Sequence, residues 1–173
     1  MRIGEVIATI NTMQSDGIIE RYAIGGAVGA TFYLEPVATL DVDVFVAFRV
    51  EPGQLLISPQ RIFDYLRAKG CATEGEYLVI AGWPVQFLPP TGSLAEEALR
   101  DAVERDLDGT PVRVFTAEHL AALALQTGRA KDHARLLQFI EAGVLDAARF
   151  QAIVARHGLG AAWERFQRRF LEL

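Results

Sequence analysis

The chain has 173 residues, of which 51% are hydrophobic and 23% are charged, and its formal net charge is −5. These values predict one compact domain, or one domain with a small helical extension, and they exclude a disordered or low-complexity chain. The sequence contains no long basic run, which excludes a broad electrostatic grip on nucleic acid. A single cysteine excludes a disulfide framework. Because no apolar stretch is long enough to span a bilayer and the N-terminus lacks secretory features, a cytoplasmic protein is expected.

The predicted elements alternate between helices and strands in the first two thirds of the chain. Apolar residues at helical spacing predict an opening helix that begins near Ile3 and ends at Asp16-Gly17. The elements predicted next are, in order, a strand at 21–24, a short helix at 27–33, a strand at 40–48, a helix from Ser58-Pro59 to Gly70, a hairpin of strands at 76–80 and 84–88, a helix at 93–106 and a strand at 112–115. Ser93 and Glu96 have the spacing of a capping box at the start of the helix at 93–106.

The remainder of the chain is predicted to be helical. Thr116 is expected to cap a helix at 117–126, and the glycines at Gly143 and 158–160 are expected to break the helices that follow. This order predicts an α+β or α/β core with a C-terminal helical region. We place the boundary between a core at 1–115 and a helical region at 116–173.

Two carboxylates interrupt the valine-rich strand predicted at 40–48. Strand alternation places Leu40 and the valines on one face, and Asp41 and Asp43 on the other. Carboxylates two residues apart on one strand face can share one or two Mg²⁺ ions, and Mg²⁺ also binds substrate phosphates. The alternatives are a solvated strand face or a pair between an aspartate and an arginine.

A glycine pair precedes this strand. Gly25-Gly26 follows a short predicted strand and opens a predicted helix, where a phosphate can approach the backbone closely. The alternative is a tight turn between strand and helix. The order of Gly-Gly, short helix and Asp-x-Asp is more specific than either motif alone.

This arrangement resembles the nucleotidyltransferase superfamily typified by DNA polymerase beta, and more closely the small bacterial proteins grouped with the AbiEii toxin family. The resemblance rests on Tyr22-Ala23-Ile24-Gly25-Gly26 and on Thr39-Leu40-Asp41-Val42-Asp43-Val44. Further matches are Glu118-His119-Leu120 and Gly128-Arg129-Ala130-Lys131-Asp132. Together these segments cover about residues 20 to 142.

The resemblance implies a mixed sheet flanked by helices and the transfer of a nucleotide from a nucleoside triphosphate. It implies that Asp41 and Asp43 are catalytic and hold Mg²⁺. It also implies that the triphosphate is bound by a set of residues from both motifs, namely Gly25, Gly26, Thr39, Arg129, Lys131 and Asp132. Acceptors in the family include tRNA, proteins and small hydroxyl compounds, and some members have toxin–antitoxin roles.

The sequence departs from the family pattern where a third carboxylate is expected. That place, in the predicted strand at 84–88, holds Gln86, an amide that is a neutral ligand and a poor base. Glu35, Glu74 or Glu76 are the residues that could substitute for it. The sequence therefore supports two hypotheses: an active nucleotidyltransferase, or an inactive relative that binds a nucleotide, RNA or a protein partner.

Charged and aromatic residues in the helical region have two interpretations each. Lys131 or Arg129 could reach a triphosphate while Asp132 orients a base, or an ion pair between an aspartate and an arginine could link the helical region to the core. His119 and His157 are predicted to be surface or capping residues. The aromatic and basic helix at 163–170 could contact RNA, or its aromatic residues could pack on the core or on a second subunit, as in a homodimer.

Overall fold

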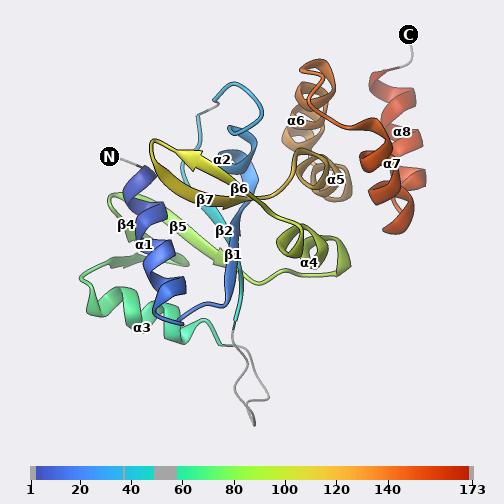
Figure 1. Ribbon diagram of the computed structural model, residues 1–173. Coiled ribbons are helices and arrows are strands. Elements are labelled where there is room, and N and C mark those ends of the chain that lie inside the picture. The colour runs from blue at the N-terminus through green and yellow to red at the C-terminus, as the bar shows by residue number, and fades with distance from the viewer. Residues whose placement is uncertain (1–2, 37, 49–57, 172–173) are drawn as a thin grey trace.

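The computed structural model of the chain contains one mixed sheet with helices on both faces and a group of helices at the C-terminal end (Figure 1). The structure describes residues 3–36, 38–48 and 58–171. Within these residues the strands are β1 Arg21–Ile24, β2 Val42–Ala47, β3 Ala72–Glu74, β4 Tyr77–Ile80, β5 Trp83–Leu88, β6 Val103–Leu107 and β7 Thr110–Val114. The helices are α1 Ile3–Ser15, α2 Gly26–Ala30, α3 Gln60–Ala68, α4 Ser93–Arg100, α5 Ala117–Thr127, α6 Ala130–Glu141, α7 Ala147–Arg156 and α8 Gly160–Phe170. The predicted fold class, a mixed sheet with flanking and C-terminal helices, is confirmed.

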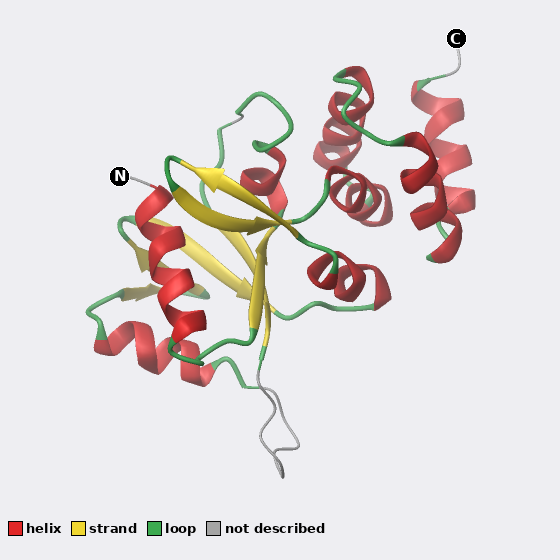
Figure 2. Cartoon of the chain, in the orientation of Figure 1, coloured by secondary structure: helices red, strands yellow, loops and turns green. Residues whose placement is uncertain are grey.

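The strands lie in the order β3-β4-β5-β2-β1-β7-β6, with β2 and β1 near the centre (Figure 2). β2 runs antiparallel to β1 and parallel to β5, and β1 runs parallel to β7. The register of β2 and β5 pairs Asp43 with Gln86. The residue at the place of the expected third carboxylate is therefore the direct neighbour of Asp43.

The alternation predicted for β2 sorts its side chains onto the two faces of the sheet. Val42, Val44 and Val46 are fully buried in an apolar cluster with residues of α1 and α3. Asp43 and Phe45 point to the other face and are half-buried. That face is covered by a second apolar cluster that draws on α4 and on the C-terminal helices. One face of β2 is therefore buried in the core, and Asp43 and Phe45 on its other face line a cavity.

The strand predicted at 40–48 is shorter than expected. The strand begins at Val42, and Leu40 in the preceding loop is 89% exposed, so Leu40 does not join the valines in the core. Residues 49–57, between this strand and the helix that follows, lie outside the described residues.

The helix predicted at 93–106 is wrong in its second half. α4 ends at Arg100, and β6 follows it and pairs antiparallel with β7. The two strands are joined by Asp108-Gly109, and both residues have positive φ angles, 51° and 84°. Asp-Gly is a strong signal for a two-residue hairpin. β3 was also not predicted; it joins β4 through a two-residue turn at Gly75-Glu76.

The predicted capping box at the start of α4 is not formed. Gly92 occupies the N-cap position, and the hydroxyl of Ser93 forms a 3.0 Å hydrogen bond with Nδ1 of His157 in the turn after α7. Ser93 therefore links two helices. Thr116, in contrast, caps α5 as predicted, because its hydroxyl oxygen accepts a hydrogen bond from the backbone N–H of His119.

The aromatic residues of α8 pack inside the helical region. Phe166 is buried, and Trp163 contacts both Phe166 and Phe150 of α7 at centroid distances of 5.7 and 5.1 Å. This packing favours the structural interpretation of the helix. The domain boundary placed at residue 116 and the formation of a homodimer both remain predictions. No helix in the described part of the chain is both long and apolar enough to cross a membrane.

Candidate functional site

Asp41 and Asp43 line one cavity of about 1010 Å³ at the start of β2. Asp43 lies within the strand, and Asp41 lies just before it. The hydroxyl of Thr39 donates a hydrogen bond to the backbone carbonyl of Asp41 (3.1 Å) and lies 3.4 Å from its carboxylate. The hydroxyl of Tyr77, on β4, is 3.5 Å from the other carboxylate oxygen. Thr39 and Tyr77 thus hold Asp41 at the cavity wall.

The glycine pair meets the aspartate pair directly. The backbone N–H of Gly25 donates a 3.0 Å hydrogen bond to the carbonyl of Asp43, which fixes the end of β1 against β2. Gly26 has a φ angle of 56°, and a Cβ at this residue would overlap with the carboxylate of Asp43. Only glycine satisfies both conditions without strain. Local geometry therefore requires Gly26, and its absent side chain leaves room for the carboxylate.

The wall opposite α2 comes from the hairpin strands. Gln86 of β5 lies beside Asp43 in register, and its side chain lines the same cavity. Glu74 of β3 also lines it, and Glu74 is the register partner of Tyr77. Among the three glutamates considered as substitutes, the cavity wall includes Glu74, whereas Glu35 and Glu76 lie outside it.

Burial raises the pKa of Asp43 above its ordinary value, and the negative charge of Asp41 raises this pKa further. Three cations oppose the shift: Arg135, Lys131 and Arg129, all from α6 or its N-cap. A carboxylate that is costly to ionise gains from a bound divalent cation, because the cation stabilises the charged form. Two carboxylates with a neighbouring amide oxygen are oxygen donors of the kind that Mg²⁺ prefers. The residues present therefore fit a Mg²⁺ ion.

Arg129 and Asp132 form a tight pair at the start of α6. The carboxylate of Asp132 accepts hydrogen bonds from Nε of Arg129 (2.6 Å), from its Nη2 (3.3 Å) and from its backbone N–H (3.3 Å). Asp132 is buried, whereas the side chain of Arg129 is 60% exposed. These hydrogen bonds raise the pKa of Arg129. Asp132 thus caps its own helix and orients Arg129. The predicted ion pair is present, but it lies within one turn of α6 instead of between the helical region and the core.

All eight residues that the sequence analysis assigned to the site lie in one region, and one residue was missed. Gly26, Thr39, Asp41, Asp43, Arg129, Lys131 and Asp132 line the cavity, and Gly25 lies directly behind it. Arg135 was missed, although it lines the cavity and is the cation that most lowers the pKa of Asp43. Its spacing of one helical turn from Lys131 was the available signal.

A second charged cluster lies away from this cavity, where α4 and α5 meet the C-terminal end of α7. Glu97 is 6% exposed, and its carboxylate accepts hydrogen bonds from Arg156 (2.6 and 2.9 Å). It also contacts Nε2 of His157 at 2.8 Å and Nε2 of His119 at 3.1 Å. The hydrogen bonds from Arg156 are the main reason that the pKa of Glu97 is held far below its ordinary value.

The prediction that His119 and His157 are surface or capping residues is wrong for His119, which lies buried within α5, whereas His157 occupies the C-cap position of α7 as predicted. The side chains of His119 and His157 are only 4% and 6% exposed, and both contact Glu97. Glu97, Asp101 and His119 also place possible metal-ligand atoms within 4.8 Å of one another. Arg156 already balances the charge of Glu97, so this cluster reads as a structural link between helices.

Comparisons with known proteins identify the fold. No protein-family model and no curated protein matches the chain. A crystal structure of an antigenic nucleotidyltransferase-like protein from Paracoccidioides brasiliensis is similar at a TM-score of 0.56, with 15% identity over 93% of this chain and 91% of that chain. The chain has a nucleotidyltransferase-like fold.

Structures of ANT(2'')-Ia support the same assignment of the fold. Its crystal structure in complex with adenylyl-2''-tobramycin matches at a TM-score of 0.54, with 15% identity over 94% of this chain and 98% of that chain. A solution structure of this antibiotic-resistance factor matches at 0.54, with 14% identity over 96% and 97% of the two chains. Nucleotidyltransferase-like architecture therefore extends through the C-terminal helices.

Proposed function

We propose that the protein is a Mg²⁺-dependent nucleotidyltransferase that transfers a nucleotide from a nucleoside triphosphate to a hydroxyl-bearing acceptor. The observation that carries this proposal is the contact between Gly26 and the carboxylate of Asp43 at the wall of a large cavity. Asp41 lines the same cavity, as do the cations of α6. The glycine turn at the end of β1 thus holds Asp43 at the cavity wall together with Asp41, and these are the two carboxylates that the proposal assigns to the metal.

Each part of the site has a distinct task in this proposal. Asp41 and Asp43 hold Mg²⁺, which when bound neutralises phosphate charge and activates the attacking hydroxyl. Lys131, Arg129 and Arg135 supply positive charge for the triphosphate, and Asp132 keeps the guanidinium of Arg129 oriented. Thr39 positions Asp41. Gly25 and Gly26 allow the phosphates to approach the backbone.

The candidate acceptors and the biological role in this proposal are inferred from the family resemblance alone. Across the family the acceptors range from tRNA and proteins to small hydroxyl compounds, and a toxin–antitoxin role would follow from the AbiEii-like resemblance. ANT(2'')-Ia, whose structure contains an adenylylated tobramycin, exemplifies a small-molecule acceptor on a similar fold. A cytoplasmic location fits all three acceptor classes.

A second candidate function is nucleotide, RNA or protein binding without turnover. It is favoured by the pairing of Asp43 with Gln86, because an amide cannot take a proton from an acceptor hydroxyl. Under this alternative the cavity binds a triphosphate and Mg²⁺, but nothing is transferred. Glu74, which lines the cavity, is the carboxylate that could restore a base to the active hypothesis.

One pair of measurements separates the two candidates. Calorimetry with each of the four ribonucleoside triphosphates and Mg²⁺ measures binding, and incorporation of labelled nucleotide into tRNA, protein or aminoglycoside acceptors measures transfer. Binding that is lost in Asp41→Asn and Asp43→Asn supports both candidates, whereas transfer that is lost in these variants supports the enzyme. An absence of triphosphate binding in the wild-type protein would overturn the enzyme and would leave only RNA or protein binding of the second candidate.

The role of Glu74 is tested against its near neighbour Glu76, which lies outside the cavity. Glu74→Gln should abolish transfer and leave triphosphate binding within about twofold, because the metal ligands remain. Glu76→Gln, two residues away in the chain, should change neither. Equal transfer by the two variants would remove Glu74 from the mechanism.

A further inference from the structure

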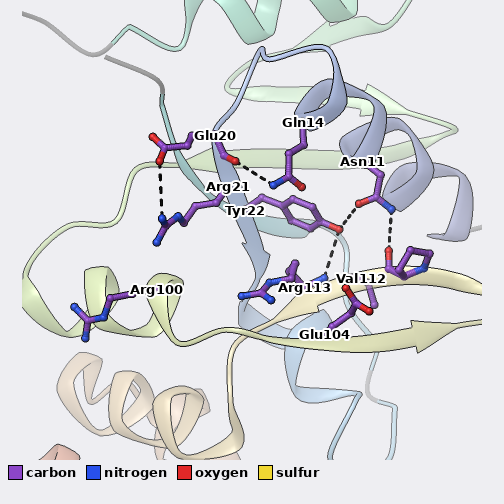
Figure 3. A pocket seen from close by; sticks show the side chains of 10 residues that line it. Asn11, Gln14, Glu20, Arg21, Tyr22, Arg100, Glu104, Val112 and Arg113 are labelled. Atoms are coloured by element: carbon purple, nitrogen blue, oxygen red, sulfur yellow. Dashed lines mark hydrogen bonds and ion pairs between the residues drawn. The ribbon is translucent and has the colours of Figure 1, made fainter. Parts of the chain in front are cut away.

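A second cavity, of about 600 Å³, lies near the start of β1 (Figure 3). Gly25 and Gly26 follow the other end of this strand. The walls of the cavity come from α1, β1, the end of α4, β6 and β7. Three arginines line it, each from a different element: Arg21 of β1, Arg100 of α4 and Arg113 of β7. We call it the arginine cavity. Neither the resemblance nor the proposed reaction uses it.

The arginine cavity exists because β1 and β7 separate. The two parallel strands pair only at Ile24 and Val114. Farther toward the start of β1, the backbone N–H of Arg113 donates to the hydroxyl of Tyr22 (3.4 Å) instead of to a strand. The Tyr22 hydroxyl donates to Oδ1 of Asn11 (2.7 Å).

The same side chains give the cavity a fixed floor. Nδ2 of Asn11 donates to the carbonyl of Pro111 at 2.8 Å, so the amide ties α1 to β7 while it holds Tyr22. Tyr22 is 1% exposed. Because the hydroxyl and the amide are both engaged, the floor is rigid before any ligand arrives. A preformed site loses less entropy on binding.

The arginines differ in how well their charges are balanced. Arg21 has a long contact with Glu20 (3.8 Å), and Arg100 pairs with Asp101 (3.1 Å), and both arginines are largely exposed. Arg113 is half-buried and forms no ion pair within the described part of the chain, although Glu104 is its register partner on β6. An incompletely balanced guanidinium in a concave site favours an anionic ligand.

The chemistry of the walls narrows the class of ligand. Guanidinium groups bind phosphate oxygens in a fork geometry. The one aromatic ring of the cavity belongs to Tyr22, which is buried, so no ring is available to stack on a base. Glu20 and Glu104 at the walls, with a net charge of −5 on the chain, oppose a long polyanion. We propose that the arginine cavity binds the phosphate group of a small phosphorylated molecule through Arg21, Arg100 and Arg113.

Amide NMR of the full chain, titrated with inorganic pyrophosphate in the presence of EDTA, tests the proposal directly. EDTA removes metal-assisted binding in the first cavity, and the amides of Gly26 and the start of α6 report separately any binding there to Arg129, Lys131 and Arg135. Saturable shifts are expected at the backbone amides of Arg21, Tyr22 and Arg113. Shifts confined to Gly26 and the start of α6, or shifts that do not saturate, would overturn the proposal.

Three variants sharpen the test. Arg113→Gln should weaken pyrophosphate binding about tenfold, because it removes a charge-assisted hydrogen bond. Glu104→Gln should strengthen binding about threefold by removing a repelling charge, an effect that misfolding cannot produce. Arg168→Gln, an exposed arginine of α8, serves as the control and should leave binding unchanged. Equal affinities for the wild-type protein and both cavity variants would overturn the proposal.

A short single-stranded RNA without a terminal phosphate distinguishes the source of the phosphate. If the cavity binds a small phosphorylated molecule, the RNA should shift the amides of Arg21, Tyr22 and Arg113 only at concentrations well above those needed for pyrophosphate. Tighter binding of the RNA at the same amides would overturn the assignment to a small molecule.

Discussion

The backbone of Gly26 lies against the carboxylate of Asp43, with no space for a side chain between them. This contact joins the end of β1 to the middle of the candidate site, because the N–H of Gly25 also donates to the carbonyl of Asp43. The glycine pair and the aspartate pair are therefore one structural unit. A change at the glycine is expected to move the carboxylate.

Gly26→Ala tests this unit. A Cβ would overlap with the carboxylate of Asp43, and alanine at a φ of 56° is strained as well, so destabilisation of about 2 kcal/mol is expected. Triphosphate binding should fall more than tenfold. Gly143→Ala is the matched control, since Gly143 has a similar φ of 64° and open space around it. Denaturant unfolding and calorimetry measure both effects. If the two variants are equally stable and Gly26→Ala binds normally, the contact has no consequence.

The ionisation of Asp43 gives a second prediction, for the metal-free protein. Since the folded-state pKa of Asp43 is raised, the stability that its neutral form contributes is present below the unfolded pKa, about 3.9, and is lost as pH rises through the folded value. Asp43→Asn keeps a neutral side chain at every pH. The variant should therefore melt higher than the wild-type protein at pH 7, and the difference should close below about pH 4.

Magnesium should reverse this order. At a Mg²⁺ concentration about a hundred times its Kd, the wild-type protein should gain about 2.7 kcal/mol, while Asp43→Asn should gain little. Thermal melts in EDTA and in Mg²⁺ at pH 7 supply the comparison. Equal stabilisation of both proteins by Mg²⁺ would place the metal elsewhere.

The sequence was sufficient to predict the centre of the sheet and most of the site. Strand alternation placed Asp43 on the face opposite the buried valines, and the glycine pair was expected before α2. These features are local, because period-two patterning and turn chemistry are written in neighbouring residues. Asp41 and Thr39 were found in the same motif.

The hairpin of β6 and β7 has a local signal, the Asp108-Gly109 turn, which argues against a helix over the residues of β6. The other features depend on contacts between distant segments. Glu97 and His157 meet only because α7 folds back on α4, and no pattern within either segment predicts that contact. The arginine cavity likewise draws on five separate elements.

Arg135 provides a third prediction, for the site itself. Arg135→Gln removes the cation that most favours ionised Asp43, and with it a charge available to the triphosphate. Triphosphate affinity should fall about tenfold, the size of one charge-assisted hydrogen bond. Arg168→Gln, on the exposed side of α8, is the control and should bind normally. Unchanged affinity in calorimetry with Arg135→Gln would exclude this residue from ligand binding.

Glu97 provides the last prediction, for the helical region. Glutamine is a weaker acceptor than the buried carboxylate for the hydrogen bonds from Arg156, so Glu97→Gln should lose roughly 2 kcal/mol of stability, or about 5 °C in Tm. Exposed Glu96, next in the chain, supplies the control Glu96→Gln, for which little change is expected.

Because the folded-state pKa of Glu97 is lowered, the stability that its carboxylate contributes is present above the unfolded pKa of about 4.3 and is lost as pH falls toward the folded value. The difference in Tm should therefore persist at pH 7 and narrow below about pH 4. Equal melting of the two variants at pH 7 would show that the cluster does not stabilise the contact between α4 and α7.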